Sequence, residues 1–152
     1  AAGVYIGIHP DDPPVYALGG VPRCIFGTFE GYKRAIEIAD SPNIGVCLCV
    51  GCWLEGGAAM GCDVVEVIRY FGGLGKLFKV HFRNVSNPLP APWRETFIDD
   101  GYMDMNKVMR ALQDVGYDGC IIPDHIPAMA GGPGTGLAYS IAYMRALVQA
   151  AV

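Results

Sequence analysis

The sequence predicts a parallel α/β fold of four strand–helix units, which corresponds to half of an eight-stranded (βα)8 barrel. Four short apolar runs occur, of the kind that form strands buried on both faces. A helix-like segment follows each run, and right-handed crossovers then make the strands parallel. Each run also ends at a residue that can bind a divalent metal, and parallel α/β folds bind ligands at that edge. The runs and the residues after them are Val4–Ile8 with His9, Ile44–Leu48 with Cys49, Leu77–Val80 with His81, and Cys120–Pro123 with Asp124.

The first unit and the second strand have clear boundaries. The strand Val4–Ile8 is followed by a Pro- and Gly-rich stretch, His9 to Gly27, which predicts a loop. A helix is expected from its N-cap Thr28 to Ala39, because Pro42 cannot continue it. The second strand is then Ile44–Cys49.

The second unit has a glycine-rich connection and an amphipathic helix. The glycines that predict a loop are Gly51, Gly56, Gly57 and Gly61. Asp63 can cap the helix that follows, and Gly72 and Gly73 end it. Its apolar positions share one face; they are Val64, Val67, Ile68 and Phe71.

The third strand is Lys76–Phe82, and the loop after it, Arg83 to Gly101, is long and contains three prolines. Loops of this length often have a function. Asp104 then caps a helix that ends at Gly116. The apolar stripe of this helix is Met105, Val108, Met109, Leu112 and Val115.

The fourth strand is Gly119–Pro123, and a glycine-rich loop leads from it to Gly136. That loop lacks the lysine of a P-loop, so it is a weak phosphate-binding signal. The last helix is expected from about Leu137 to the end of the chain. Its predicted stripe is Ile141, Met144, Leu147, Val148 and Ala151.

Composition limits the classes of function. The 152 residues suffice for one domain with a real core, and 52% of them are hydrophobic. The net charge is -4 and no basic stretch occurs, so we expect no nucleic-acid partner. No apolar run reaches the roughly 18 residues of a membrane span. Six cysteines without a secretory signal favour the reducing cytoplasm, and the start without Met suggests a chain that begins within the fold.

Side-chain alternation places the four potential ligands on one face. In the third strand, His81 shares a face with Lys79 and Arg83, whereas Phe78, Val80 and Phe82 share the other. The apolar set must pack against helices, so His81 and Arg83 point into the barrel. The same alternation predicts that Cys49 points inward together with Cys47, and that Asp124 does so together with Ile122. On the first strand, His9 points inward together with Tyr5 and Gly7. Chance would produce this agreement only about one time in eight.

Two imidazoles, a thiolate and a carboxylate form a reasonable ligand set for a divalent ion, and ligand softness favours zinc or ferrous iron. Each residue also has an ordinary interpretation: His81 as a hydrogen-bonded core histidine, Cys49 as a buried thiol, Asp124 as a turn cap, and His9 as the start of a rigid turn. A rival site is the cluster of Cys47, Cys49 and Cys52, although its spacing fits no standard zinc or iron–sulfur motif.

Several motifs then occur in an order typical of one family. The longest is Ile8-His9-Pro10-Asp11-Asp12-Pro13-Pro14, followed by Gly20-Val21-Pro22-Arg23. The shorter ones are Cys49-Val50-Gly51, His81-Phe82-Arg83, Asp100-Gly101, Met103-Asp104-Met105 and Pro123-Asp124-His125. In these motifs the chain resembles mannonate dehydratase. The resemblance implies a xylose-isomerase-like TIM barrel, of which residues 1–152 would be a single domain, the C-terminal half.

The resemblance also implies an activity and a set of site residues. The family is a metal-dependent hydro-lyase that converts D-mannonate to 2-keto-3-deoxy-D-gluconate in hexuronate breakdown. Its metal is usually manganese, with Fe²⁺, Co²⁺ and Zn²⁺ as alternatives. The family's ligands His, Cys, His and Asp match His9, Cys49, His81 and Asp124. Its acid–base pair would be His125 and a tyrosine, for which Tyr139 is the nearest match and Tyr143 the substitute.

Two arginines are candidates for binding a sugar-acid carboxylate. Arg83 has the planar fork that such a group needs, and Arg23 has weaker support. An ion pair of Arg83 with Asp11, Asp12 or Asp100 is the alternative. A metal-dependent sugar isomerase or epimerase on the same barrel is the second hypothesis for the function, and an inactive half-barrel is the third. Because half a barrel leaves open sheet edges, we expect a homo-oligomer or part of a longer chain.

Overall fold

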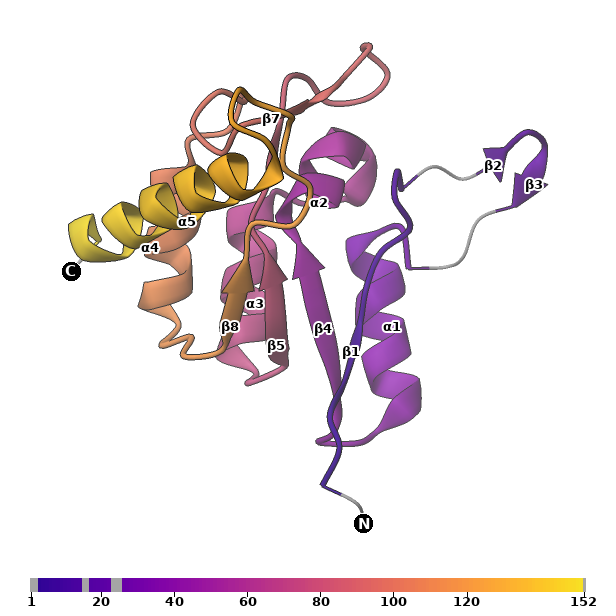
Figure 1. The fold of residues 1–152 in the computed structure, drawn as a ribbon. Coiled ribbons are helices and arrows are strands. Elements are labelled where there is room, and N and C mark those ends of the chain that lie inside the picture. The colour runs from indigo at the N-terminus through magenta and orange to yellow at the C-terminus, as the bar shows by residue number, and fades with distance from the viewer. Residues whose placement is uncertain (1–2, 15–16, 23–25, 152) are drawn as a thin grey trace.

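The computed structural model describes residues 3–14, 17–22 and 26–151. It contains a four-stranded sheet in the order β1-β4-β5-β8 (Figure 1), and every neighbouring pair is parallel. The strands are β1 (Ile6–Ile8), β4 (Ile44–Cys49), β5 (Leu77–His81) and β8 (Cys120–Ile122). The four predicted strands are therefore confirmed. The second has the predicted bounds, and the others are one or two residues shorter at their ends.

Three of the helices begin directly after the residues that are predicted to cap them, Thr28, Asp63 and Asp104. The helices are α1 (Phe29–Ala39), α2 (Val50–Gly56), the 3-10 helix η1 (Gly57–Met60), α3 (Val64–Gly73), α4 (Met105–Asp114) and α5 (Pro133–Ala150). The Thr28 hydroxyl accepts a hydrogen bond from the Gly31 N–H at 3.1 Å. Asp63 forms a full capping box with Glu66 at the start of α3. Local side-chain chemistry therefore sets where the helices begin.

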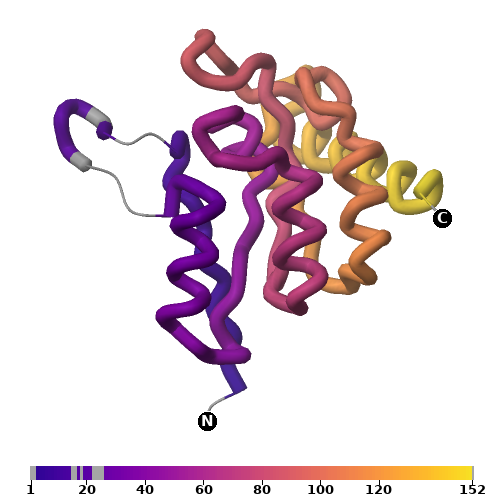
Figure 2. Tube along the Cα trace, turned by 180° about the vertical axis from the view of Figure 1, so that it is seen from behind, coloured from indigo at the N-terminus to yellow at the C-terminus, as the bar shows by residue number. Residues whose placement is uncertain are grey.

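Three helices cover one face of the sheet. Figures 1 and 2 show α1, α3 and α4 side by side behind the strands, whereas α5 lies outside this layer, beside β8 at the edge of the sheet. The core lies between the sheet and these three helices. The predicted stripes of α3 and α4 are buried in it, except that Val115 lies just beyond α4 and is only partly buried. Completely buried apolar side chains include Val46, Leu48, Val67, Ile68, Val80 and Val108. The uncovered face holds most of the residues that alternation predicts to point inward, but Arg83 is buried and does not line the pocket there.

The prediction of a loop after β4 is wrong, because that segment forms α2 and η1. Cys49 caps α2, with its Sγ 3.4 Å from the Cys52 N–H. Gly51 lies against Arg83, and a Cβ there would be 2.4 Å from Arg83 Cγ. A Cβ on Gly56 would be 2.3 Å from Met60 Sδ. These glycines serve close packing within a helix and do not break it.

The two long predicted loops contain short hairpins. Strands β2 (Ala17–Leu18) and β3 (Val21–Pro22) pair within the first loop, and β6 (Asn84–Val85) pairs with β7 (Glu95–Thr96) within the second. The buried Asn84 side chain donates to the carbonyl oxygens of Ile98 and Met103, at 3.0 and 2.8 Å. These bonds tie the beginning of the segment after β5 to its end.

Helix α5 differs from the prediction in its start and in part of its stripe. It begins at Pro133, a favourable first helical residue, and not at Leu137. Met144 and Leu147 are buried as predicted, but Ile141 and Val148 are 41% and 44% exposed. Both line an open apolar hollow of about 770 Å³ beside β8. They are exposed because no described element packs on that side of α5.

Within the described ranges, no helix combines the length and the apolar character that crossing a membrane requires.

Candidate metal centre

The four potential ligands meet at the carboxyl edge of the sheet. His9 follows β1 directly, Cys49 ends β4, His81 ends β5, and Asp124 lies just beyond β8. Cys49 and His81 are direct register partners, as are His81 and Ile122. Parallel pairing in this register brings residues far apart in the chain to one place.

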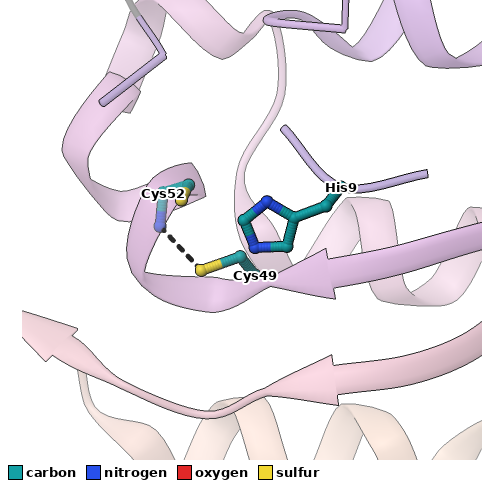
Figure 3. Close-up of side chains that lie close together, drawn as sticks. All are labelled: His9, Cys49 and Cys52. Atoms are coloured by element: carbon teal, nitrogen blue, oxygen red, sulfur yellow. Dashed lines mark hydrogen bonds between the residues drawn. The ribbon is translucent and has the colours of Figure 1, made fainter. Parts of the chain in front are cut away.

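Two overlapping groups of metal-ligating atoms form there, and Cys49 belongs to both. In the group of Cys49, His81 and Asp124, one ligand atom per residue lies within 4.8 Å of the others. The same holds for His9, Cys49 and Cys52. Figure 3 shows the His9 ring turned toward Cys49. The rings of His9 and His81 are 4.9 Å apart between centroids. The structure thus brings together all four residues that alternation selects.

The uncovered face of the sheet lines a pocket of about 670 Å³ next to these ligands. Its lining includes Tyr5, Gly7, His9, Asp12, Cys47, Phe78, Lys79, His81, Asp124 and His125. Most of these belong to the predicted inner face, but Phe78 does not. The register shifts between Val46 and Cys47, which pair with Leu77 and Lys79, and Phe78 is the residue left over. This irregularity explains why simple alternation fails at Phe78.

The hydrogen bonding of the two imidazoles suits metal binding. His9 Nδ1 lies 2.6 Å from the Pro10 carbonyl oxygen, which assigns the proton to Nδ1 and leaves Nε2 as a ligand atom. His81 Nδ1 is buried and has no hydrogen-bond partner among the described residues. It lies 3.4 Å from Asp124 Oδ1. An unpaired buried nitrogen beside a carboxylate is what a bound cation would satisfy.

The anionic ligands fit a divalent ion as well. The Cys52 hydrogen bond, both imidazoles and the Arg83 charge together lower the pKa of Cys49, although burial opposes them. Asp124 has φ 61, an uncommon backbone conformation for a residue other than glycine. Its Oδ2 is 3.8 Å from Cys49 Sγ. The donor set of two nitrogens, a sulfur and an oxygen therefore fits a divalent transition metal.

Cysteine residues other than Cys49 have a smaller role in this geometry. Cys52 belongs to a group with His9, whereas Cys47 belongs to none of the described metal groups. Cys47 Sγ instead lies 3.5 Å from His81 Nε2. Burial raises the pKa of Cys47 to about 11, so its thiol stays protonated near neutral pH. The geometry favours the mixed ligand set over the three-cysteine cluster.

Arg83 lies behind the ligands in a buried ion-pair network. It is 1% exposed, and its donors reach Glu55 Oε1 at 2.5 Å, Asp12 Oδ2 at 2.9 Å and Asp124 Oδ2 at 3.1 Å. Asp12 is one of the three ion-pair partners that the sequence allows. Arg83 is not among the residues that line the pocket. The bond from Nε holds the carboxylate of a potential ligand in place.

The network includes residues that the sequence analysis missed. Glu55 is fully buried, and burial raises its pKa to about 8 against the attraction of Arg83. Glu95 lies near both Arg83 and His125. A charged residue directly after the apolar run Val50–Leu54 is the one signal that pointed to Glu55.

The proposed acid–base residues occupy different surroundings. His125 lines the pocket, and its Nδ1 makes a very short contact with Glu95 Oε1 that raises the pKa of His125. Tyr139 lies on α5 and is not among the pocket residues; its hydroxyl donates to Asp99 Oδ2 at 2.5 Å. Burial raises the pKa of Tyr143. Arg23 lies outside the described residues.

Sequence comparisons identify relatives of this chain. The family model for D-mannonate dehydratase (UxuA) matches residues 1–152. The chain is 35% identical over 140 residues to "Mannonate dehydratase 2" of Halalkalibacterium halodurans, a match that covers 89% of this chain and 39% of the relative. The chain thus spans well under half the length of this curated relative.

Comparisons with solved structures also find a mannonate dehydratase. The crystal structure of mannonate dehydratase from Streptococcus suis serotype 2 has a TM-score of 0.82 and 32% identity, and covers 99% of this chain and 44% of that one. A xylose isomerase-like TIM barrel protein from Mycobacterium smegmatis, in complex with magnesium, has a TM-score of 0.58 at 16% identity, over 84% of this chain and 42% of that one. The second likeness shows the fold alone, a part of a TIM barrel. The chain belongs to the D-mannonate dehydratase family.

Proposed function

We propose that this chain forms the metal-binding side of a mannonate dehydratase active site, which removes water from D-mannonate to give 2-keto-3-deoxy-D-gluconate. The observation that carries the proposal is the convergence of Cys49, His81 and Asp124 within 4.8 Å, with His9 beside them, at the carboxyl edge of the sheet. Family membership supports the reaction, and the pocket on the uncovered face has room for a small sugar acid.

Each of the site residues has a separate proposed role in the reaction. Removal of the proton next to the substrate carboxylate builds up negative charge, which a bound divalent ion would stabilise. His125 at the pocket and Tyr139 are the proposed acid–base pair for the C2 proton and the C3 hydroxyl. Arg23 is proposed to bind the substrate carboxylate. Arg83, with its donors on Asp12, Glu55 and Asp124, would act on the ligand Asp124 and not on the substrate.

His9, Cys49, His81 and Asp124 are proposed to hold the metal. Manganese is the proposed ion by family resemblance, and the thiolate also suits Fe²⁺, Co²⁺ or Zn²⁺. Metal analysis of protein purified without added metal would rank the four ions.

The active protein is proposed to contain more of the barrel than this domain of residues 1–152. Exposed apolar side chains at both ends of the sheet support this. Tyr5, just before β1, and Ile6 on β1 are 65% and 57% exposed. Leu137 and Ile141 on α5, beside β8, are 44% and 41% exposed. The remaining strands would come from a second copy in a homo-oligomer or from a longer chain, in the cytoplasm. Light scattering that finds a stable, compact monomer of this chain would count against it.

The test of function is turnover by the protein that carries this chain. D-mannonate and neutral ketoses are supplied separately with Mn²⁺, and the 2-keto-3-deoxy product is measured. We expect product from D-mannonate alone, and loss of product and of bound metal in Cys49→Ala. Turnover of neutral sugars only would reject the dehydratase in favour of an isomerase or epimerase. Bound metal without any turnover would indicate an inactive half-barrel.

A further inference from the structure

The segment between β5 and α4 presents a carboxylate to the proposed acid–base histidine. Glu95 lies on β7, and its Oε1 accepts a very short hydrogen bond from His125 Nδ1. The same oxygen is 3.8 Å from Arg83 Nη1, so a buried cation faces the Glu95 carboxylate. His125 itself lines the pocket beside Asp124.

The backbone that carries Glu95 is firmly held. Val85 and Glu95 are register partners between β6 and β7, and the neighbouring pair is Asn84 with Thr96. Both members of that second pair are buried, at 0% and 4% exposure. Since strand side chains alternate, the burial of Thr96 turns Glu95 to the opposite side, where His125 lies. A surface ion pair on a flexible loop would lack this support.

We propose that Glu95 is a positioning residue for His125, which fixes the ring orientation and the tautomer with the proton on Nδ1. This inference rests on the proposed function, in which His125 exchanges a proton with the substrate. A carboxylate on one ring nitrogen determines which nitrogen remains available for chemistry. Among the described residues, Nε2 of His125 has no protein partner and is the atom left for the substrate.

A second carboxylate of the same segment supports this role. Asp99 lies four residues after Glu95 and accepts the hydrogen bond from the Tyr139 hydroxyl at 2.5 Å. The ring of Phe97 packs edge-on against Tyr139, with 5.3 Å between centroids. The long Pro-containing segment thus contacts both proposed acid–base residues through carboxylates.

The first experiment reads the tautomer without any need for turnover. The chain has three histidines, so the ring nitrogens of His125 can be assigned in ¹⁵N NMR spectra by comparison with His125→Ala. Spectra are recorded on the alkaline plateau of the ¹⁵N shifts, where a further rise in pH no longer changes them. We expect the Nδ1–H form in the wild type and in Glu95→Gln, whose amide oxygen can still accept the bond. Glu95→Ala should revert to the Nε2–H form that a free histidine side chain favours in water. An unchanged tautomer in Glu95→Ala would overturn the proposal.

The second experiment measures D-mannonate turnover by the protein that carries this chain. Loss of an outer hydrogen-bond partner typically costs about 10- to 100-fold. We expect that loss in kcat for Glu95→Ala, with KM and metal content unchanged and with recovery in Glu95→Gln. Arg94→Ala, an exposed change next to Glu95, controls for the hairpin and should behave as the wild type.

Different results would contradict the role of Glu95 and the acid–base role of His125. Wild-type kcat in Glu95→Ala together with an inactive His125→Ala would remove Glu95 from the mechanism and leave the proposed function intact. Wild-type kcat in His125→Ala would instead reject the acid–base assignment, whatever the tautomer.

Discussion

Replacing Glu55 by Gln should change how stability depends on pH. Glu55 is completely buried, and Arg83 Nη1 donates to its Oε1 at 2.5 Å. Its other oxygen, Oε2, has no hydrogen-bond partner in the described part of the chain. Burial raises the pKa of Glu55 from 4.5 to about 8, against the attraction of Arg83 and with help from nearby Asp12. Glutamine keeps an acceptor for Arg83 and removes the titration.

The sign follows from which state holds the proton. In the folded protein Glu55 stays protonated up to about pH 8, whereas in the unfolded chain it ionises above 4.5. The folded state therefore binds the extra proton between these values, and stability from this group falls as the pH rises through that window. Each pH unit well inside the window is worth about 1.4 kcal/mol and less near its ends, so from pH 5 to pH 8 the wild type should lose about 3.5 kcal/mol relative to Glu55→Gln.

The assay is urea unfolding at pH 5, 6, 7 and 8 with a metal chelator present, followed by tryptophan fluorescence. Trp53 is 2% exposed and lies two residues from Glu55, so its signal reports on this region. Glu37→Gln is the matched control, because the side chain of Glu37 is 60% exposed and its curve should run parallel to the wild type. If the curves of Glu55→Gln and the wild type also run parallel from pH 5 to 8, then Arg83 keeps Glu55 ionised and the reasoning is refuted.

Three further predictions concern packing, capping and the metal. Gly51→Ala should lower the free energy of unfolding by about 1–3 kcal/mol, because its Cβ would lie 2.4 Å from the Arg83 side chain. A Cβ on Gly134, at the start of α5, would meet no atom within 4 Å, so Gly134→Ala should instead raise the free energy of unfolding by about 0.5–1 kcal/mol. Equal melting temperatures for the two variants would contradict this. Asp63→Ala removes the acceptor for the N–H groups of Val65 and Glu66 and should cost about 1 kcal/mol, seen as a lower urea midpoint; an unmoved midpoint would show that the cap is dispensable. Mn²⁺ at 100 times its Kd should stabilise by about 2.7 kcal/mol, measured by thermal melts, and Cys49→Ala should abolish the gain; a gain that survives the substitution would place the ion elsewhere.

The fold could be predicted where the information is local. The continuous apolar runs give all four strands, since only buried parallel strands tolerate such composition. Thr28, Asp63 and Asp104 mark helix starts because a short polar side chain must satisfy free N–H groups there. The four potential ligands could be found for the same reason, because each lies at the end of its own strand or within two residues after it.

The sequence analysis failed where distant contacts decide the outcome. Gly51 and Gly56 look like loop residues, yet they lie in or end α2 because Arg83 and Met60 pack directly against them. The burial of Glu55 depends on Arg83, which is 28 residues away in the chain. Phe78 faces the pocket because of a register shift that no periodicity shows. Pairing across tens of residues leaves no local signal of this kind.

The central claim is that His9, Cys49, His81 and Asp124 surround a single ion. The most direct measurement is anomalous diffraction at the manganese edge from crystals grown with Mn²⁺. We predict one strong peak bonded to these four side chains, at the edge where β1, β4, β5 and β8 end. A peak held instead by Asp12, Cys52 and Glu55, the other group of ligand atoms within 4.8 Å of one another, or no peak in the pocket, would contradict it.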